Sequence, residues 1–134
     1  MSETLDSSVR ALVEGRNFAH LSVLRKDGTI QSAVVWVHTD GDDLVINSAE
    51  GRGWPANLRR TGQATISIHN QENPYEFASI ACKLTGDTHE GADDVIDALA
   101  KKYMDADSYP FRQEGEQRVT FTLTPGRVTH YGGS

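Results

Sequence analysis

The sequence predicts a mainly β domain, with six or seven antiparallel strands in a closed or nearly closed barrel and short helices at its ends. The 134 residues fit a single domain, residues 1–134. Strand-like alternation recurs in short segments separated by turn residues, and helical periodicity appears in only a few places. The strand-like segments are residues 18–24, 29–38, 44–48, 64–68, 75–84, 118–124 and 128–131. A barrel this small is filled by its own side chains, so a large ligand is expected in an outer groove or between subunits.

The first part of the chain predicts a helix followed by a three-strand meander. Apolar residues recur at helical spacing over residues 5–13, and Gly15 follows as a stop. The first three strand-like segments come next. Asp-Gly pairs at 27–28 and 40–41 separate them, and glycine adopts the positive φ of a tight hairpin turn without steric cost.

The second part predicts two more helices and a final hairpin. Pro55 suits the first turn of a helix of about two turns within residues 51–60. An amphipathic helix over residues 91–104 has acids at its start and lysines near its end, which matches the helix dipole. A polar loop over residues 105–117 follows. The last two strands are expected to form a hairpin around positions 125–126.

Composition and charge exclude several classes of protein. Thirteen Lys and Arg against nineteen Asp and Glu give a net charge of −6, the wrong sign for a protein that coats nucleic acid. The longest apolar run, residues 33–37, is far too short for a membrane span. An acid near the start, within residues 1–4, argues against a secretory signal. A single cysteine, Cys82, cannot form an internal disulfide, so we expect a cytoplasmic protein in which Cys82 is a small buried residue rather than a nucleophile.

The familiar catalytic and metal-binding motifs are missing from the sequence. The five histidines are scattered and have no metal-ligand spacing, so no metal site is expected. No nucleophile elbow, P-loop or Gly-x-Gly-x-x-Gly is present. Because no acid–base pair or nucleophile stands out, we assign no catalytic residue. If the protein is an enzyme, a cofactor must carry the reaction.

One locally basic stretch stands out in this acidic chain. Residues 51–71 contain no acid but include Arg52, Arg59 and Arg60. A Gly-Arg-Gly loop at 51–53 that leads into a helix offers backbone N–H groups and a guanidinium, which together suit a phosphate or carboxylate. Arg59 and Arg60 are more simply explained as the solvated end of the short helix.

Two tryptophans are candidates for a ring-binding surface. Trp54, at the start of the predicted helix, could cover a flat heteroaromatic ring or close the end of the barrel core. Trp36 alternates with Val34 and His38, so these three side chains should share one face of their strand. One face of that strand is expected to line the core and the other a groove.

Several short motifs carry a resemblance to a known family. They are GRGWPANLRR at 51–60, NPY at 73–75, GAD at 91–93, DALAKKY at 97–103, YPF at 109–111, GEQR at 115–118 and TP at 124–125. In this order they resemble the pyridoxamine 5′-phosphate oxidase-like split-barrel superfamily. More narrowly, they are similar to its flavin/deazaflavin oxidoreductase branch, common in actinobacteria, whose members are probable F420-dependent enzymes. The match runs from about residue 18 to residue 131.

The resemblance implies an FMN-binding-like split β-barrel homodimer with two cofactor sites in grooves between the subunits. It implies an oxidoreductase that transfers a hydride between coenzyme F420 and a small organic acceptor. Many relatives have lysine at the place of Trp54 and arginine at the place of Ala56, so the choice of F420 over FMN stays open. The alternatives are an FMN-dependent oxidoreductase and a non-catalytic protein that binds a flavin, a deazaflavin or a tetrapyrrole.

The resemblance also implies the residues that hold the cofactor. Arg52 is expected to pair with the phosphate or tail carboxylates, with Ser48 and Asn57 as hydrogen-bond partners. Val34 and Trp36 form the wall behind the ring, and Tyr75 and the loop 109–112 reach the partner's site. The full predicted set is Val34, Trp36, Ser48, Ala49, Glu50, Gly51, Arg52, Trp54, Asn57 and Tyr75. No residue specifies the acceptor.

Overall fold

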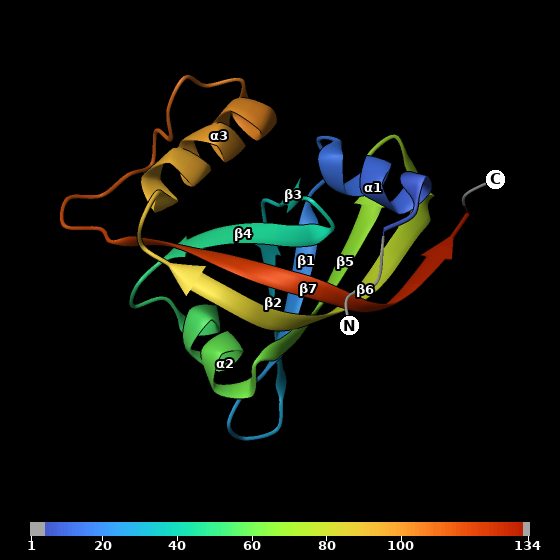
Figure 1. Cartoon of the computed structure of the whole chain (residues 1–134), viewed down its shortest axis with the longest axis horizontal. Helices are drawn as coiled ribbons and strands as arrows, with labels where there is room; N and C mark the ends of the chain where they lie inside the picture. Colours follow the sequence, from blue (N-terminus) through green and yellow to red (C-terminus); the bar gives the residue numbers. More distant parts are fainter. Residues whose placement is uncertain (1–4, 133–134) are drawn as a thin grey trace.

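The chain folds into a seven-stranded antiparallel sheet and three helices, as a computed structural model of residues 5–132 shows (Figure 1). Of the predicted 1–134 domain, residues 1–4 with their acid and residues 133–134 lie outside the described part. The strands are β1 (Ala19–Leu24), β2 (Ile30–Val35), β3 (His38–Asp40), β4 (Asp43–Ala49), β5 (Gln63–Asn70), β6 (Asn73–Thr88) and β7 (Arg118–Tyr131). The helices are α1 (Ser7–Glu14), α2 (Gly53–Thr61) and α3 (Ala92–Met104). The sheet order is β2-β1-β5-β6-β7-β4-β3, which confirms the mainly β fold class.

The strand predicted over residues 29–38 is divided in two. β2 ends at Val35 and pairs with β1, whereas β3 begins at His38 and pairs with β4. These two short strands lie at opposite ends of the sheet order, so the chain crosses from one edge to the other here and nearly closes the barrel. At the crossing, Val37 has side-chain partners from α3: its N–H donates to the Tyr103 hydroxyl (3.2 Å) and its carbonyl accepts from Lys102 Nζ (2.6 Å). The backbone can leave the sheet because these partners satisfy it.

The hairpin predicted around Pro125 and Gly126 is wrong, because residues 118–131 form the single long strand β7. β7 runs antiparallel to β6 along its length, with irregular register next to Cys82 and again near Gly86. Pro125 lies opposite Cys82 at the first irregularity, where its missing N–H interrupts no regular ladder. Pairing with a long neighbouring strand therefore outweighs the local turn preference of Pro-Gly.

The three predicted helices are all present. α1 begins after Asp6, whose carboxylate accepts a hydrogen bond from the Val9 N–H (3.0 Å), and it ends at Gly15. α2 has Pro55 in its first turn and ends at Gly62 with φ of 70°, the left-handed conformation that glycine adopts at low cost. α3 packs against β4 and β7, α2 against β1 and β5, and α1 against β3, β5 and β6 (Figure 1). No helix within residues 5–132 is long and apolar enough to span a membrane.

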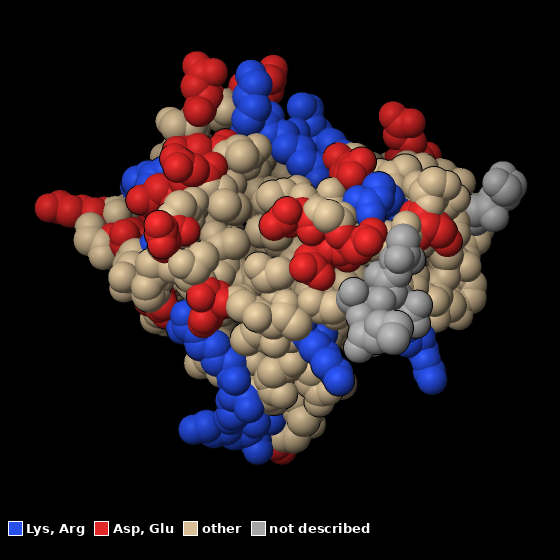
Figure 2. Space-filling model, in the orientation of Figure 1, with Lys and Arg blue, Asp and Glu red and all other residues tan. Residues whose placement is uncertain are grey.

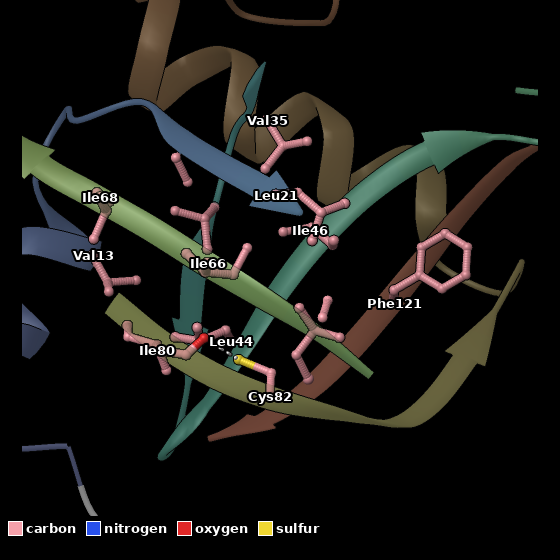
Figure 3. Close-up of a cluster of buried hydrophobic side chains, with 14 of the residues drawn as sticks. Val13, Leu21, Val35, Leu44, Ile46, Ile66, Ile68, Ile80, Cys82 and Phe121 are labelled. Atoms are coloured by element: carbon pink, nitrogen blue, oxygen red, sulfur yellow. Dashed lines mark hydrogen bonds between the residues drawn. The ribbon is translucent and has the colours of Figure 1, made fainter. Parts of the chain in front are cut away.

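Apolar side chains fill the inside of the curved sheet (Figure 3). Leu44, Ile66 and Ile80 point toward one another from three different strands and are fully buried. Cys82 lies in the same cluster, and burial raises the pKa of its thiol to about 12. The prediction that Cys82 is a small buried residue is therefore confirmed, and a thiol with this pKa is not a nucleophile at neutral pH.

Candidate functional site

A pocket of about 180 Å³ lies outside the barrel core, among β2, β4, the start of α2, α3 and the loop 105–117. Residues far apart in the sequence meet here. Five of the ten predicted cofactor-binding residues line it: Val34, Trp36, Ser48, Arg52 and Trp54. The structure therefore brings together the predicted ring wall, one predicted hydrogen-bond partner and the predicted anion partner.

The pocket has aromatic walls. The Trp36 ring stacks on Tyr103 of α3, with centroids 5.4 Å apart and planes 7° from parallel. Trp54 packs on Phe121 at 5.4 Å and is nearly buried, so it belongs to the barrel core while one part of it faces the pocket. Both roles considered for Trp54 are thus compatible with its position. A flat ring could lie against these surfaces with favourable stacking.

Ser48 contributes a polar atom without a partner. Its side chain, near the end of β4, is buried, and within residues 5–132 its Oγ has no hydrogen-bond partner. A buried hydroxyl that makes no hydrogen bond costs free energy, so such a group in a pocket wall is a candidate for a ligand contact. The start of α2 next to it has no side-chain cap and no acid in its first turn, which leaves its dipole available to an anion.

Two arginines supply the positive charge at the pocket. Arg52, about half exposed, lies 3.3 Å from Glu116 Oε1, and Arg118 lies 2.7 Å from the same oxygen. Arg118 is almost completely buried, its guanidinium stands 5.0 Å from the centre of the Tyr109 ring, and its Nε donates to Asn47 Oδ1 (2.9 Å). Burial by itself raises the pKa of the Glu116 carboxyl. The hydrogen bond from Arg118 and the charges of both arginines together lower it by more, so the pKa lies below its ordinary value. Glu116 is therefore ionised at neutral pH.

Sequence reasoning missed Asn47 and Arg118 as pocket residues. Arg118 opens β7, and its motif was used only as part of the family resemblance. A useful signal was present, because an arginine followed directly by alternating Val119, Phe121 and Leu123 occupies the first position of a buried strand. A buried arginine needs an anionic partner.

The other five predicted residues do not line this pocket, and each has a different position. The backbone of Ala49 pairs with β7, and Gly51 forms the turn after β4 with φ of 90°. Asn57 donates to Gln31 Oε1 (2.9 Å) on β2. Tyr75 is 84% exposed near the start of β6. The side chain of the fifth, Glu50, accepts hydrogen bonds from Arg59, which lower its pKa to about 2 together with a 2.6 Å bond to His89.

The remaining arginines of the basic stretch have structural partners. Arg59 is held by Glu50 and by Asp87 at 2.7 Å, and Arg60 donates to the Leu24 carbonyl. Figure 2 shows basic side chains at the lower end of this face, where α2 and the turn between β1 and β2 lie, and acidic side chains mixed with other basic ones over the upper part. Arg52 thus differs from its two neighbours because it faces the pocket. Within residues 5–132 no three His, Cys, Asp or Glu side chains are grouped as metal ligands.

Known proteins resemble this chain in structure. No family model matches the sequence, and no curated protein does either. An F420 reductase superposes with a TM-score of 0.81 and 20% identity over 93% of this chain and 98% of its own. A putative pyridoxamine 5′-phosphate oxidase from Listeria innocua gives a TM-score of 0.72 and 15% identity, over 94% of this chain and 97% of its own. An FMN-binding protein from Syntrophomonas wolfei subsp. wolfei gives 0.64 and 18%, over 94% and 85%. The chain therefore has the FMN-binding-like split β-barrel fold, as the sequence predicts.

Proposed function

We propose that the protein is an oxidoreductase that binds coenzyme F420 and transfers a hydride between it and a small organic acceptor. The observation that carries this proposal is the composition of the pocket: aromatic walls, two arginines and the unpaired Ser48 hydroxyl meet on a fold shared with an F420 reductase. Such a surface suits a ligand that combines a flat ring with an anionic group.

Each group on the pocket has a role in binding. Arg52 pairs with a phosphate or a tail carboxylate, and Ser48 Oγ donates a hydrogen bond to the same part of the ligand. Val34 and Trp36 form the wall behind the ring, and Trp54 shields it from water. Reduced F420 supplies a hydride rather than single electrons, because carbon replaces the reactive nitrogen of a flavin. The protein binds and orients the cofactor and excludes water from the site, and we assign no catalytic side chain.

We also propose that a second copy of the chain completes the site. Val34 lines the pocket and is 63% exposed, and Ile30 on the same face of the edge strand β2 is 67% exposed. Apolar side chains this open on an edge strand favour a covering partner. The structure places Tyr109 and Phe111 on the pocket of their own chain, whereas Tyr75 is free to reach a partner. Sedimentation analysis should give a dimer, and Val34→Asp should yield monomers.

The test of the function is titration of the flavin-free protein with F420 and, separately, with FMN, followed by fluorescence quenching. Tight binding of F420 and weak binding of FMN supports the proposal and justifies an acceptor screen. The reverse preference assigns the protein to FMN chemistry, the alternative favoured by its likeness to an FMN-binding protein. If neither binds, the proposed function is wrong.

Arg52→Ala tests the anion partner directly. Losing one charged hydrogen bond should weaken cofactor binding by about 1.5–3 kcal/mol. Arg127→Ala is the matched control, because this arginine lines a different hollow with Cys82 and Lys83. Equal cofactor affinities of the two folded variants would show that Arg52 does not bind the cofactor.

A further inference from the structure

Two side chains of the loop 105–117, Tyr109 and Phe111, line the pocket, and Tyr109 meets the Trp36 ring edge-on at 6.0 Å. The carboxylate of Glu116, from the same loop, pairs with two arginines of the pocket wall, Arg52 and Arg118. We propose that Arg118, Arg52 and Ser48 form a binding site for a phosphate group, and that Glu116 is a built-in competitor which the phosphate displaces. The proposal rests on the proposed function in one respect, because a flavin-type cofactor is the source of that phosphate.

The guanidinium of Arg118 is fixed by the sheet, whereas the carboxylate of Glu116 belongs to the loop 105–117. Arg118 starts β7 and is anchored through Nε to Asn47 of β4. Asn47 is fixed in turn by hydrogen bonds to the Ala92 carbonyl (3.0 Å) and to Thr120 Oγ1 (3.1 Å). The Arg118 guanidinium therefore stays in place if Glu116 leaves. A second arginine nearby makes an anion necessary there in either state.

Glu116 does not pair with all the hydrogen-bond donors of the site. A single oxygen, Oε1, is shared by both arginines, and the buried Ser48 hydroxyl makes no hydrogen bond within the described residues. A phosphate has three terminal oxygens and could accept from both guanidinium groups and from Ser48 together. These donors therefore suit a phosphate better than the single carboxylate of Glu116 that pairs with the arginines now.

The pocket within one chain is small for such a ligand, and the loop is held in a way that allows it to move. The pocket holds about 180 Å³, whereas sites for ligands of cofactor size usually hold about 300–1,000 Å³. Contacts with α3 form the outer hold on the loop. Arg112 pairs with Asp93 (2.7 Å) and Asp97 (2.8 Å), and the Tyr109 N–H donates to Asp97 (2.9 Å). The two Arg112 pairs lie at the surface and are weak enough to exchange. Displacing Tyr109 and Glu116 would open the ring space and the phosphate site at once.

The decisive variant is Glu116→Gln, with Glu114→Gln as a matched control that removes the same charge from an exposed position of the loop. The probes are inorganic phosphate, FMN and riboflavin, which has the same ring as FMN but no phosphate. Binding is followed by thermal shift and by tryptophan fluorescence, because both tryptophans of the chain line the pocket. We expect Glu116→Gln to melt at a lower temperature without ligand and to bind phosphate and FMN about tenfold more tightly than wild type, with a smaller gain for riboflavin, which uses only the ring space.

The outcomes separate this proposal from a purely structural role of Glu116. A structural role would lower the melting temperature but leave phosphate affinity at the wild-type value, and that result would overturn the proposal. If Glu116→Gln does not fold, Arg112→Gln releases only the outer hold and should raise FMN affinity about threefold, the effect of a surface pair. Unchanged FMN affinity in a folded Arg112→Gln would then overturn the proposal.

The same experiment distinguishes failure of the proposed function from failure of the competitor role of Glu116. If neither F420 nor FMN binds any variant but inorganic phosphate still binds Glu116→Gln more tightly than Glu114→Gln, the proposed function fails and the phosphate site stands. If F420 or FMN binds wild type and Glu116→Gln equally well, the function stands and the competitor role fails.

Discussion

Two arginine–carboxylate clusters involve residues of α2 or directly before it, and they differ in where their carboxylates come from. The Arg59 cluster consists of Arg59, in the last turn of α2, with Glu50, Asp87 and His89. The Arg118 cluster consists of Arg118, Glu116, Asn47 and Arg52, which directly precedes α2. In the first, Glu50 directly follows β4 and Asp87 belongs to β6. In the second, the carboxylate comes from the loop 105–117.

The difference shows which cluster can exchange its anion. Arg59 has one partner within a strand, Asp87, and one directly after a strand, Glu50, so its neighbours are permanent and serve the fold. Arg118 is more deeply buried than Arg59, yet its anion is attached to a segment outside the sheet. Deep burial makes an anion obligatory, and attachment to a loop makes that particular anion replaceable. The number of ion pairs alone would not separate a site from a structural contact.

The largest effect is expected for Arg118→Met. The variant leaves Glu116 buried with only Arg52 as a cationic partner and removes the donor to Asn47 Oδ1. Breaking a buried pair costs about 3–5 kcal/mol, so we expect a loss of about 3 kcal/mol in the free energy of unfolding. Urea denaturation measures it. Arg59→Met is the control and should cost about 1 kcal/mol, because Arg59 is partly exposed. Similar losses for the two would erase the contrast between the clusters.

Removing both charges of the buried pair sharpens the comparison. In Arg118→Met with Glu116→Leu, no carboxylate is left buried without its partner, so about half of the Arg118→Met loss should be recovered. The matched pair, Arg59→Met with Glu50→Leu, should show little recovery, since Asp87 and His89 keep partial access to water. A double-mutant cycle from urea denaturation gives both coupling energies. Strict additivity in the Arg118 cluster would contradict its burial.

The fold was predictable where the signals are local. The helices α1 and α3 follow from apolar spacing and from Asp6 and Gly91 at their starts, because caps and amphipathic faces lie within a few residues. The long strand β7 was not predictable, since Pro125 and Gly126 favour a turn locally and only pairing with β6 overrules them. The division at Val37 depends on Tyr103 and Lys102, which are distant in sequence.

The site was predictable where its residues are close in the chain. Ser48, Arg52 and Trp54 lie within seven positions of one another, and all three line the pocket. Arg118 was missed because its anchor, Asn47, is 71 positions away, and no local pattern joins the two residues. Glu50 was predicted to hold the cofactor, yet its side chain belongs to the Arg59 cluster. That cluster also contains Asp87 and His89, which are more than 30 positions away from Glu50 in the sequence.

A smaller effect is expected in acid for Glu50. The hydrogen bonds from Arg59 and His89 hold its folded pKa at about 2, below the ordinary 4.5. A lowered carboxyl pKa stabilises the fold above pH 4.5, and this contribution is lost as the pH falls toward 2. Glu50→Gln should therefore lose less than about 1 kcal/mol at pH 7, in the range of partly exposed pairs, and should show a flatter decline between pH 4.5 and 2. Thermal melts across this range test it, and an unchanged acid decline would contradict it.

The smallest effect is expected for His89→Asn. Its Nε2 lies 2.6 Å from Glu50, but Arg59 already binds both oxygens of that carboxylate, at 2.7 and 2.9 Å. The variant should cost about 0.5 kcal/mol or less, and 1 M salt, with a screening length of about 3 Å, should shrink the cost further. Phosphate affinity should stay at the wild-type value, because the Arg118 cluster does not include His89. If His89→Asn changed phosphate binding as strongly as Glu116→Gln, the two clusters would be one connected site, and the origin of the carboxylate would no longer separate a structural ion pair from a binding group.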